Sequence, residues 1–372
     1  MENLAHTLLG LSLAKSGLER ATPLATTALV ISSNLPDLDV LSRVEGGTVR
    51  YLEYHRGFTH GFVGLAVLAA GLTLLLMFVD HRFRLRRDPF RRPLRPVRIF
   101  WIAYLGGLGH AFMDFTNSYG IRPLLPFSNR WFYGDLAFVV DPWIWLILGA
   151  ALVWLTATSA TRTVVWLVIG TLASLAVALA LRHPYDPQTI AIPSSVRAIW
   201  FGGLAIVIAG ALFRWRRLGA RLVRYSLLLL ALYYGGTWMA HQSALQAARI
   251  SLTSLRPEGA ASMAAWPAPA NPLFWQSAAK SSDSIYDGSV NLLERREEWR
   301  ELPGLDPKLA DALRQSRDAR VFLDFMRYGT ANVEQRGDGT TVLALRDLRF
   351  DLRMRVELDR EMTVTYSEVR WF

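Results

Sequence analysis

The run GFVGLAVLAAGLTLLLMFV at residues 61–79 decides the fold, because it contains no charged side chain. A helix that crosses a bilayer needs about 17–25 mostly apolar residues, and this run meets that length. Residues 68–79 are apolar around the whole circumference of a helix, so no polar stripe is left to face water. The run therefore predicts a membrane span.

Similar runs recur along the 372 residues, of which 52% are hydrophobic. The predicted spans cover residues of about 61–79, 99–116, 139–157, 163–181, 198–213 and 222–240. The alternative is a large soluble helical core, which would need amphipathic helices. Because runs such as 164–181 are apolar on all sides, the composition favours a membrane protein with several spans.

The positive charge is concentrated in two short stretches. Residues 81–98 carry eight arginines and residues 214–224 carry five, although the whole chain has a net charge of +10. Short basic loops between spans are typical of cytoplasmic loops, and they do not indicate a nucleic-acid partner. Both loops give the same orientation, which places residues 117–138 and the region after residue 241 outside.

Residues 1–35 predict a helical hairpin. The apolar stretches 3–15 and 23–33 are each too short to cross a bilayer at 1.5 Å per residue, and a polar tip at 15–20 joins them. Such a hairpin brings its open ends together. It is either a re-entrant pair packed among other helices, which satisfies its backbone internally, or an interfacial amphipathic hairpin.

Five of the seven histidines fall in the first 115 residues, and four of them, His6, His55, His60 and His110, lie where apolar segments meet polar turns. They occur together with aspartates. The candidate metal ligands are His6, Asp37, Asp39, His55, His60, His110 and Asp114. His110 and Asp114 are four residues apart, so one helix face presents both. The predicted topology places all these turns at the outer membrane face.

The absence of cysteine excludes disulfides, thiolate ligands and a cysteine nucleophile. A site of imidazole nitrogens and carboxylate oxygens suits zinc first, with manganese or iron(II) as alternatives, and argues against a closed structural zinc site. The number of candidate ligands exceeds what one ion needs. One or two divalent ions are therefore expected, and a pair would activate a water for hydrolysis.

At these residues the sequence resembles the bacterial inner-membrane-bound, metal-dependent hydrolases of the YdjM-like family. The resemblance rests on four features: the early His6, the LPDLD turn at 35–39, the HRGFTH turn at 55–60 and the GHAFMDFTNSYG helix end at 109–120. It covers about residues 1–150. It implies a metal-dependent hydrolase of the bacterial inner membrane, and it adds Asp141, at the start of the next apolar segment, as a ligand.

Two of these positions have alternative interpretations. Asp141 precedes Pro142 and is equally explained as a helix N-cap. Arg56 and Asp39 are the candidate catalytic residues. The Arg56 guanidinium would clamp a phosphate or carboxylate of the substrate, or it forms a salt bridge with Asp37, Asp39 or Glu53.

Three domains are predicted: a helical membrane domain at 1–245, a linker at 246–272, and an extracytoplasmic α+β domain at 273–372. The linker is rich in Ala, Pro and Ser. Beyond it, a short helix is expected at 305–316. Strands of an antiparallel sheet are expected at 284–293, 319–327, 341–345, 350–358 and 362–371. This periplasmic domain would cover the site or select substrate, or serve as a structural sheet. The fold class is therefore mainly α, with a small α+β domain.

The sequence thus predicts a multi-pass membrane hydrolase with a metal centre at the outer face of the membrane. The expected substrate is a membrane lipid or lipid-linked phosphoester, with an ester or amide second. The alternative is a non-enzymatic metal-binding membrane protein, either a transporter or a scaffold. Transport would require ionisable residues along the span centres, and those are almost devoid of charge after residue 80.

Overall fold

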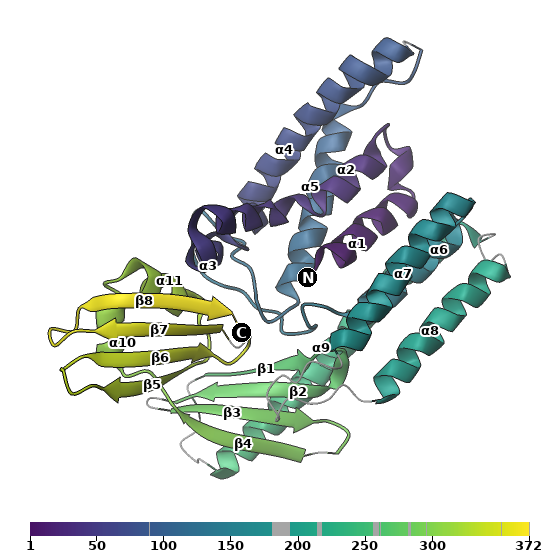
Figure 1. Ribbon diagram of the computed structural model, residues 1–372. Helices are drawn as coiled ribbons and strands as arrows, with labels where there is room; N and C mark the ends of the chain where they lie inside the picture. Colours follow the sequence, from purple (N-terminus) through teal and green to yellow (C-terminus); the bar gives the residue numbers. More distant parts are fainter. Residues whose placement is uncertain are drawn as a thin grey trace. The chain divides into compact units, whose positions relative to one another are not determined.

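The computed structural model describes residues 1–88, 90–180, 194–213, 218–255, 260, 262–281, 284–294, 296–350 and 352–371 (Figure 1). The chain forms two compact units. The first comprises Met1–Asp37, Phe58–Trp238 and Ala268–Pro272. The second comprises Leu38–Gly57, Met239–Pro267 and Leu273–Phe372. Residues 182–193 and 214–217, which include an expected outer loop and part of the second basic loop, lie outside the described residues.

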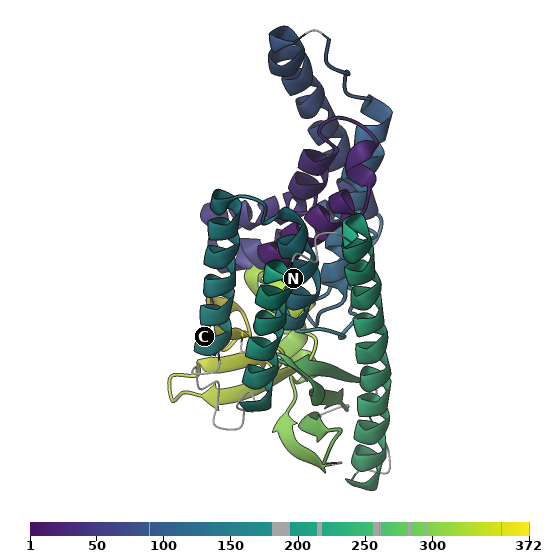
Figure 2. The ribbon, with the colours of Figure 1, turned by 90° about the vertical axis from the view of Figure 1, so that its right-hand side faces the viewer.

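Helices build the first unit. They are α1 (Asn3–Lys15), α2 (Ala25–Ser32), α4 (Phe62–Val79), α5 (Pro96–Phe115), α6 (Pro142–Thr156), α7 (Ala160–Ala180), α8 (Ser194–Leu212) and the first part of α9 (Ala220–Leu255). Figure 2 shows α9 as a single long helix. Each predicted span falls on one of these helices, α4 to α9. The predicted mainly helical fold is confirmed.

Three of the described helical segments are long and apolar enough to cross a membrane. They are Phe62–Leu85, Ala160–Ala178 and Ser195–Leu212, and Pro142–Thr156 is a shorter apolar helix. Along α4, the large apolar side chains of Leu74, Leu75 and Phe78 are exposed. Side chains of this kind are stable in such positions when lipid surrounds them. The number of crossings and their orientation stay predictions.

The predicted N-terminal hairpin is present as α1 and α2, joined by a turn that includes the short 3₁₀ helix η1 (Leu18–Arg20). The α2 helix packs against both α1 and α5. Glycines allow this close approach: Gly10 faces Ser33 and the Leu29 carbonyl, and Gly106 faces Ser32 and the same carbonyl. Whether the hairpin is re-entrant or interfacial stays a prediction.

The second unit contains two antiparallel sheets of four strands each (Figure 1). The first has the order β1 (Ser262–Ala268), β2 (Asn271–Lys280), β3 (Ser284–Asn291) and β4 (Arg296–Pro303). The second has the order β5 (Gly329–Gln335), β6 (Thr341–Asp347), β7 (Leu352–Leu358) and β8 (Val364–Trp371). The helices of this unit are α3 (Ser42–Tyr54), the end of α9, α10 (Pro307–Leu313) and α11 (Arg317–Phe325).

Two local predictions for this region were wrong. Residues 319–327 form most of α11 instead of a strand, and its buried residues Ala319, Phe322 and Leu323 follow the helical spacing of three and four. Residues 246–272 were predicted as a linker, yet α9 continues to Leu255 and β1 begins at Ser262. Ala248 of α9 and Ala265 of β1 are buried in one cluster with Trp275, and this packing explains why both segments form regular structure.

The close packing of α1 on α2 can be tested at Gly10. A Cβ at this position would overlap Ser33 Oγ and lie 2.8 Å from the backbone oxygen of Leu29. Gly10→Ala should therefore lower the free energy of unfolding by about 1–3 kcal/mol. Gly71 in α4 is the matched control, because nothing lies within 4 Å of its added Cβ. Thermal unfolding in detergent measures the effect. An unfolding temperature of Gly10→Ala equal to that of Gly71→Ala and the parent protein would contradict the close packing of α1 on α2.

Candidate metal centre

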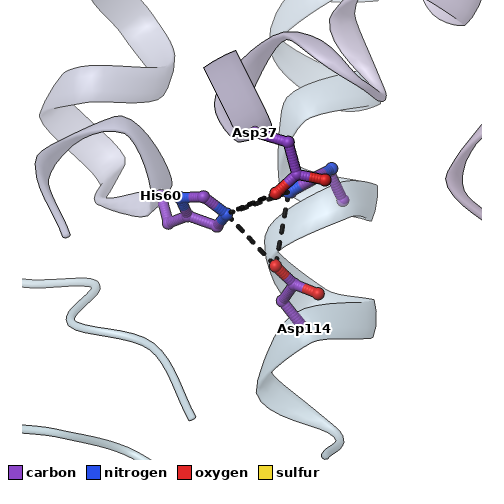
Figure 3. Close-up of side chains that lie close together, drawn as sticks. Asp37, His60 and Asp114 are labelled. Atoms are coloured by element: carbon purple, nitrogen blue, oxygen red, sulfur yellow. Dashed lines mark hydrogen bonds and ion pairs between the residues drawn. The ribbon is translucent and has the colours of Figure 1, made fainter. Parts of the chain in front are cut away.

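Four side chains from three separate segments of the first unit converge on one point (Figure 3). Asp37 comes from the 3₁₀ helix η2 (Leu35–Leu41), and His60 comes from the 3₁₀ helix η3 (Phe58–His60). His110 and Asp114 lie one turn apart near the end of α5, as their spacing predicts. We call these four residues the metal cluster.

The facing atoms of the metal cluster are 3.0–3.5 Å apart. His60 Nε2 lies 3.0 Å from His110 Nε2, 3.1 Å from Asp114 Oδ2 and 3.5 Å from Asp37 Oδ1. His110 Nε2 lies 3.3 Å from Asp114 Oδ2 and 3.5 Å from Asp37 Oδ1. Metal–ligand bonds of about 2.0–2.2 Å separate neighbouring ligand atoms by about 3.0–3.5 Å in tetrahedral or octahedral geometry. The spacing therefore fits four ligands of one divalent cation.

The hydrogen bonds around the imidazoles favour the same interpretation. His110 Nδ1 lies 2.8 Å from the Ser33 carbonyl oxygen, which only accepts, so Nδ1 carries a proton, and in the neutral ring Nε2 would present its lone pair to the cluster. His60 Nδ1 lies 3.0 Å from Thr59 Oγ1. A lone pair on one nitrogen 3.0 Å from another imidazole nitrogen requires a proton or a cation between them.

His6 of α1 lies beside the metal cluster. Its ring stacks on His110 with centroids 3.8 Å apart, and its Nε2 is 3.4 Å from Asp114 Oδ1. The side chain is fully buried, yet neither ring nitrogen makes a hydrogen bond. Burial, followed by the charge of His110, lowers the pKa of His6 to about 3, so the ring is neutral. A neutral, buried imidazole without a hydrogen bond suits a further metal ligand.

Only one side of the metal cluster is open. The side chains of His60, His110 and Asp114 are fully buried, whereas that of Asp37 is 15% exposed. Burial alone would raise the pKa of Asp37, but the imidazoles of His110 and His60 hold it well below its usual range. Asp37 is thus a carboxylate at the accessible edge. Asp114 also pairs with the amino group of Met1.

The predicted ligands Asp39 and His55 belong to the second unit and pair with one another. His55 Nδ1 lies 2.7 Å from Asp39 Oδ1, and the backbone N–H of Arg56 donates to Asp39 Oδ2 over 3.0 Å. The His55 ring stacks on Tyr51 with centroids 4.4 Å apart. Arg56 has a positive φ of 55° and a buried side chain. Asp39 therefore organises the turn that presents His55.

Asp141 is placed as a helix cap. It is the N-cap of α6, where Oδ1 accepts from the Trp143 N–H over 2.9 Å, and its Oδ2 accepts from the Tyr233 hydroxyl over 2.6 Å. Within the part of the chain that the structure describes, the metal cluster does not include it. The alternative interpretation as an N-cap is confirmed, and it accounts for the position of Asp141 without a metal.

Sequence reasoning missed three groups near the site. The Ser33 carbonyl has no side-chain signal, because it acts through its backbone. Thr59 sits inside the predicted HRGFTH turn and could have been named as a partner of His60. Glu2 caps α1 by accepting from the Ala5 N–H and also accepts from the Trp145 indole, a contact between α1 and α6 that no local pattern reveals.

Comparisons with known proteins agree with this organisation. The family model of the YdjM inner membrane proteins matches residues 1–185, which contain the whole metal cluster. The uncharacterized protein YfhP of Bacillus subtilis (strain 168) is 26% identical over 129 residues, which are 34% of this chain and 36% of that protein. The match thus spans about a third of the relative's length. No solved structure matches the chain.

The metal cluster can be tested by metal analysis of the purified protein. The protein prepared with zinc or manganese should retain bound metal after dialysis, and His110→Ala should lose it, because this change removes an inner ligand. His81→Ala is the control, since His81 is exposed and outside the cluster. Circular dichroism would show that both variants are folded. Equal metal content in the parent protein and His110→Ala would contradict the assignment.

Proposed function

We propose that the chain is a membrane-bound, metal-dependent hydrolase whose centre is the metal cluster, because the family model of the YdjM inner membrane proteins matches residues 1–185. One observation carries this proposal: side chains from three separate segments converge on one point. The nitrogens of His60 and His110 lie 3.0 Å apart, and each lies 3.1–3.5 Å from carboxylate oxygens of Asp37 and Asp114. A cluster of this kind is costly to bury unless a cation compensates it.

The donor set supports a reactive centre over a structural one. Closed structural zinc sites favour thiolates, and the chain has no cysteine. The exposed edge at Asp37 would give water and a substrate group access, while the buried residues hold the ion from the other side. A divalent cation bound there would lower the pKa of a water and polarise the bond to be cleaved. Zinc is the first candidate, and manganese or iron(II) are alternatives.

The chain's own groups would keep this centre in place. The Ser33 carbonyl holds the proton of His110 on Nδ1, which aims Nε2 inward, and Thr59 holds the His60 ring. His6 is available as a further ligand from α1. Asp39 and Arg56 are proposed to act on the substrate, with Arg56 binding a phosphate. The hydrogen bond of Arg56 N–H to Asp39 ties the two residues together.

The helix directions support a site at the outer face. The basic stretch 81–98 follows the end of α4 and precedes most of α5, whereas His60 lies just before α4 and His110 and Asp114 lie near the end of α5. These two helices pack side by side (Figure 1). If the basic stretch is cytoplasmic, the metal cluster lies at the opposite, extracytoplasmic end. We extend this to a periplasmic second unit, because α9 follows the second basic loop.

A lipid or lipid-linked phosphoester is the proposed substrate, and an ester or amide comes second. A centre at the end of membrane helices meets headgroups and their linkages, and a divalent cation with Arg56 suits phosphate. A non-enzymatic metal-binding protein, either a transporter or a scaffold, is the alternative. It would share the metal cluster but would not turn over substrate.

The proposal predicts metal-dependent release of headgroups or phosphate from lipids. The full chain in nanodiscs, supplied with zinc or manganese, should hydrolyse at least one lipid phosphoester, and chelation should stop it. Asp114→Asn should abolish turnover, because it replaces an inner carboxylate with a neutral amide. His81→Ala should keep full activity. A metal-loaded parent protein that cleaves no lipid phosphoester, ester or amide would favour the non-enzymatic alternative.

The Asp39–His55 pair predicts a separate outcome. Asp39→Asn leaves the four residues of the metal cluster unchanged, so at least one ion per chain should remain bound. If Asp39 and His55 hold a second ion, metal content should fall from two ions to one. Ion counting by mass spectrometry distinguishes the cases. Complete loss of metal in this variant would show that Asp39 belongs to the metal cluster itself.

A further inference from the structure

The segment Leu38–Gly57 exposes a run of large apolar side chains near its start. Val44 is 85% exposed, and Leu38, Val40 and Leu41 are also exposed. We call residues 38–44 the apolar tip. A soluble protein rarely exposes a contiguous apolar patch unless a partner or a membrane covers it. The apolar tip therefore requires an explanation.

The rest of the segment is anchored within the second unit. α3 packs against α11, Glu53 accepts from the Arg317 guanidinium over 2.5 Å, and Leu52 is buried. These contacts use the C-terminal half of α3. Gly46 and Gly47 interrupt the helical dihedrals between this half and the apolar tip, with Gly47 at a φ of 66°. The C-terminal half of α3 is therefore held by packing, and the apolar tip precedes it in the chain.

The apolar tip follows directly on Asp37, a residue of the metal cluster. Asp37 lies 3.5 Å from His60, and the candidate span Phe62–Leu85 begins two residues after His60. Leu38, Val40 and Leu41 follow Asp37 directly within η2, where each residue advances about 2.0 Å. Leu41 therefore lies about 8 Å along the η2 axis from Asp37, whose carboxylate contacts His60.

The aromatic rings and the exposed Arg43 of the segment suit the headgroup level of a phospholipid surface, and Arg50 pairs with Glu45 over 2.9 Å. Arg43 is exposed and lies over the Tyr51 ring at 6.0 Å, and Arg50 lies over the half-exposed Tyr54 ring at 5.5 Å. Tyrosine and arginine beside exposed aliphatic side chains are typical of segments that lie at the headgroup level. The occupant that this chemistry fits is phospholipid.

We propose that the apolar tip inserts into the boundary between headgroups and acyl chains of the bilayer. Insertion would fix the depth of η2, and with it the accessible carboxylate of Asp37, at the level of lipid headgroups. The inference rests on exposure and connectivity, and it holds whether or not the chain hydrolyses lipid.

The absence of cysteine makes a direct test possible. Single variants Val44→Cys and Leu41→Cys of the full chain, each labelled with an environment-sensitive dye, are placed in nanodiscs containing phosphatidylglycerol with a spin label near the headgroup. Leu74→Cys, exposed within the span, is the lipid-facing control, and Val333→Cys, 49% exposed on β5, is the control in the second unit.

The proposal expects the spin-labelled lipid to quench the dye at positions 44 and 41 several-fold more than at 333, and lipid labelled deep in the acyl chain to quench position 44 less than position 74. Metal content should stay that of the parent protein. Quenching at 44 and 41 no greater than at 333 would overturn the proposal. Quenching of the same dyes by iodide in solution is a second measurement. If the dyes at 44 and 41 are protected from iodide only at high protein concentration, the proposal is also overturned, because the apolar tip would then contact another copy of the chain.

Discussion

Two imidazole nitrogens lie 3.0 Å from one another and 3.1–3.5 Å from two carboxylate oxygens, and this approach is the constraint on which the first unit depends. Lone pairs of His60 and His110 and the oxygens of Asp37 and Asp114 would repel one another in a buried place without a cation or protons. Because the four residues come from three segments, satisfying them closes η2, η3 and the end of α5 onto one point.

The helical hairpin explains how that closure is reached. α2 lies against α1 and α5, and Gly10 and Gly106 let its last turn approach closely enough for the Ser33 carbonyl to meet His110 Nδ1. The chain then turns at Pro36 and presents Asp37. One backbone contact therefore links the packing of small residues to the orientation of a ligand. The same packing brings His6 against His110 from the other helix of the hairpin.

The segment Leu38–Gly57 is linked along the chain to the metal cluster and packs within the second unit. Its ends continue directly into Asp37 and the turn of His60, yet α3 packs with α11 and β8 of the second unit. The C-terminal part of the chain, which has no predicted ligand of its own, therefore supports the turn that carries Asp39, His55 and Arg56.

The sequence by itself determined the mainly helical fold and the N-terminal hairpin, because apolar run lengths are local properties. It also placed Asp37, His60, His110 and Asp114 among a larger set of candidate ligands, but which of these residues meet depends on the packing of distant segments. Tertiary structure decided the rest. α11 replaced a strand because burial on one face selects the helical period, and Asp141 capped a helix and bonded Tyr233. It also paired Asp39 with His55 in a segment that packs on α11, since long-range packing leaves no trace in the spacing of a short motif.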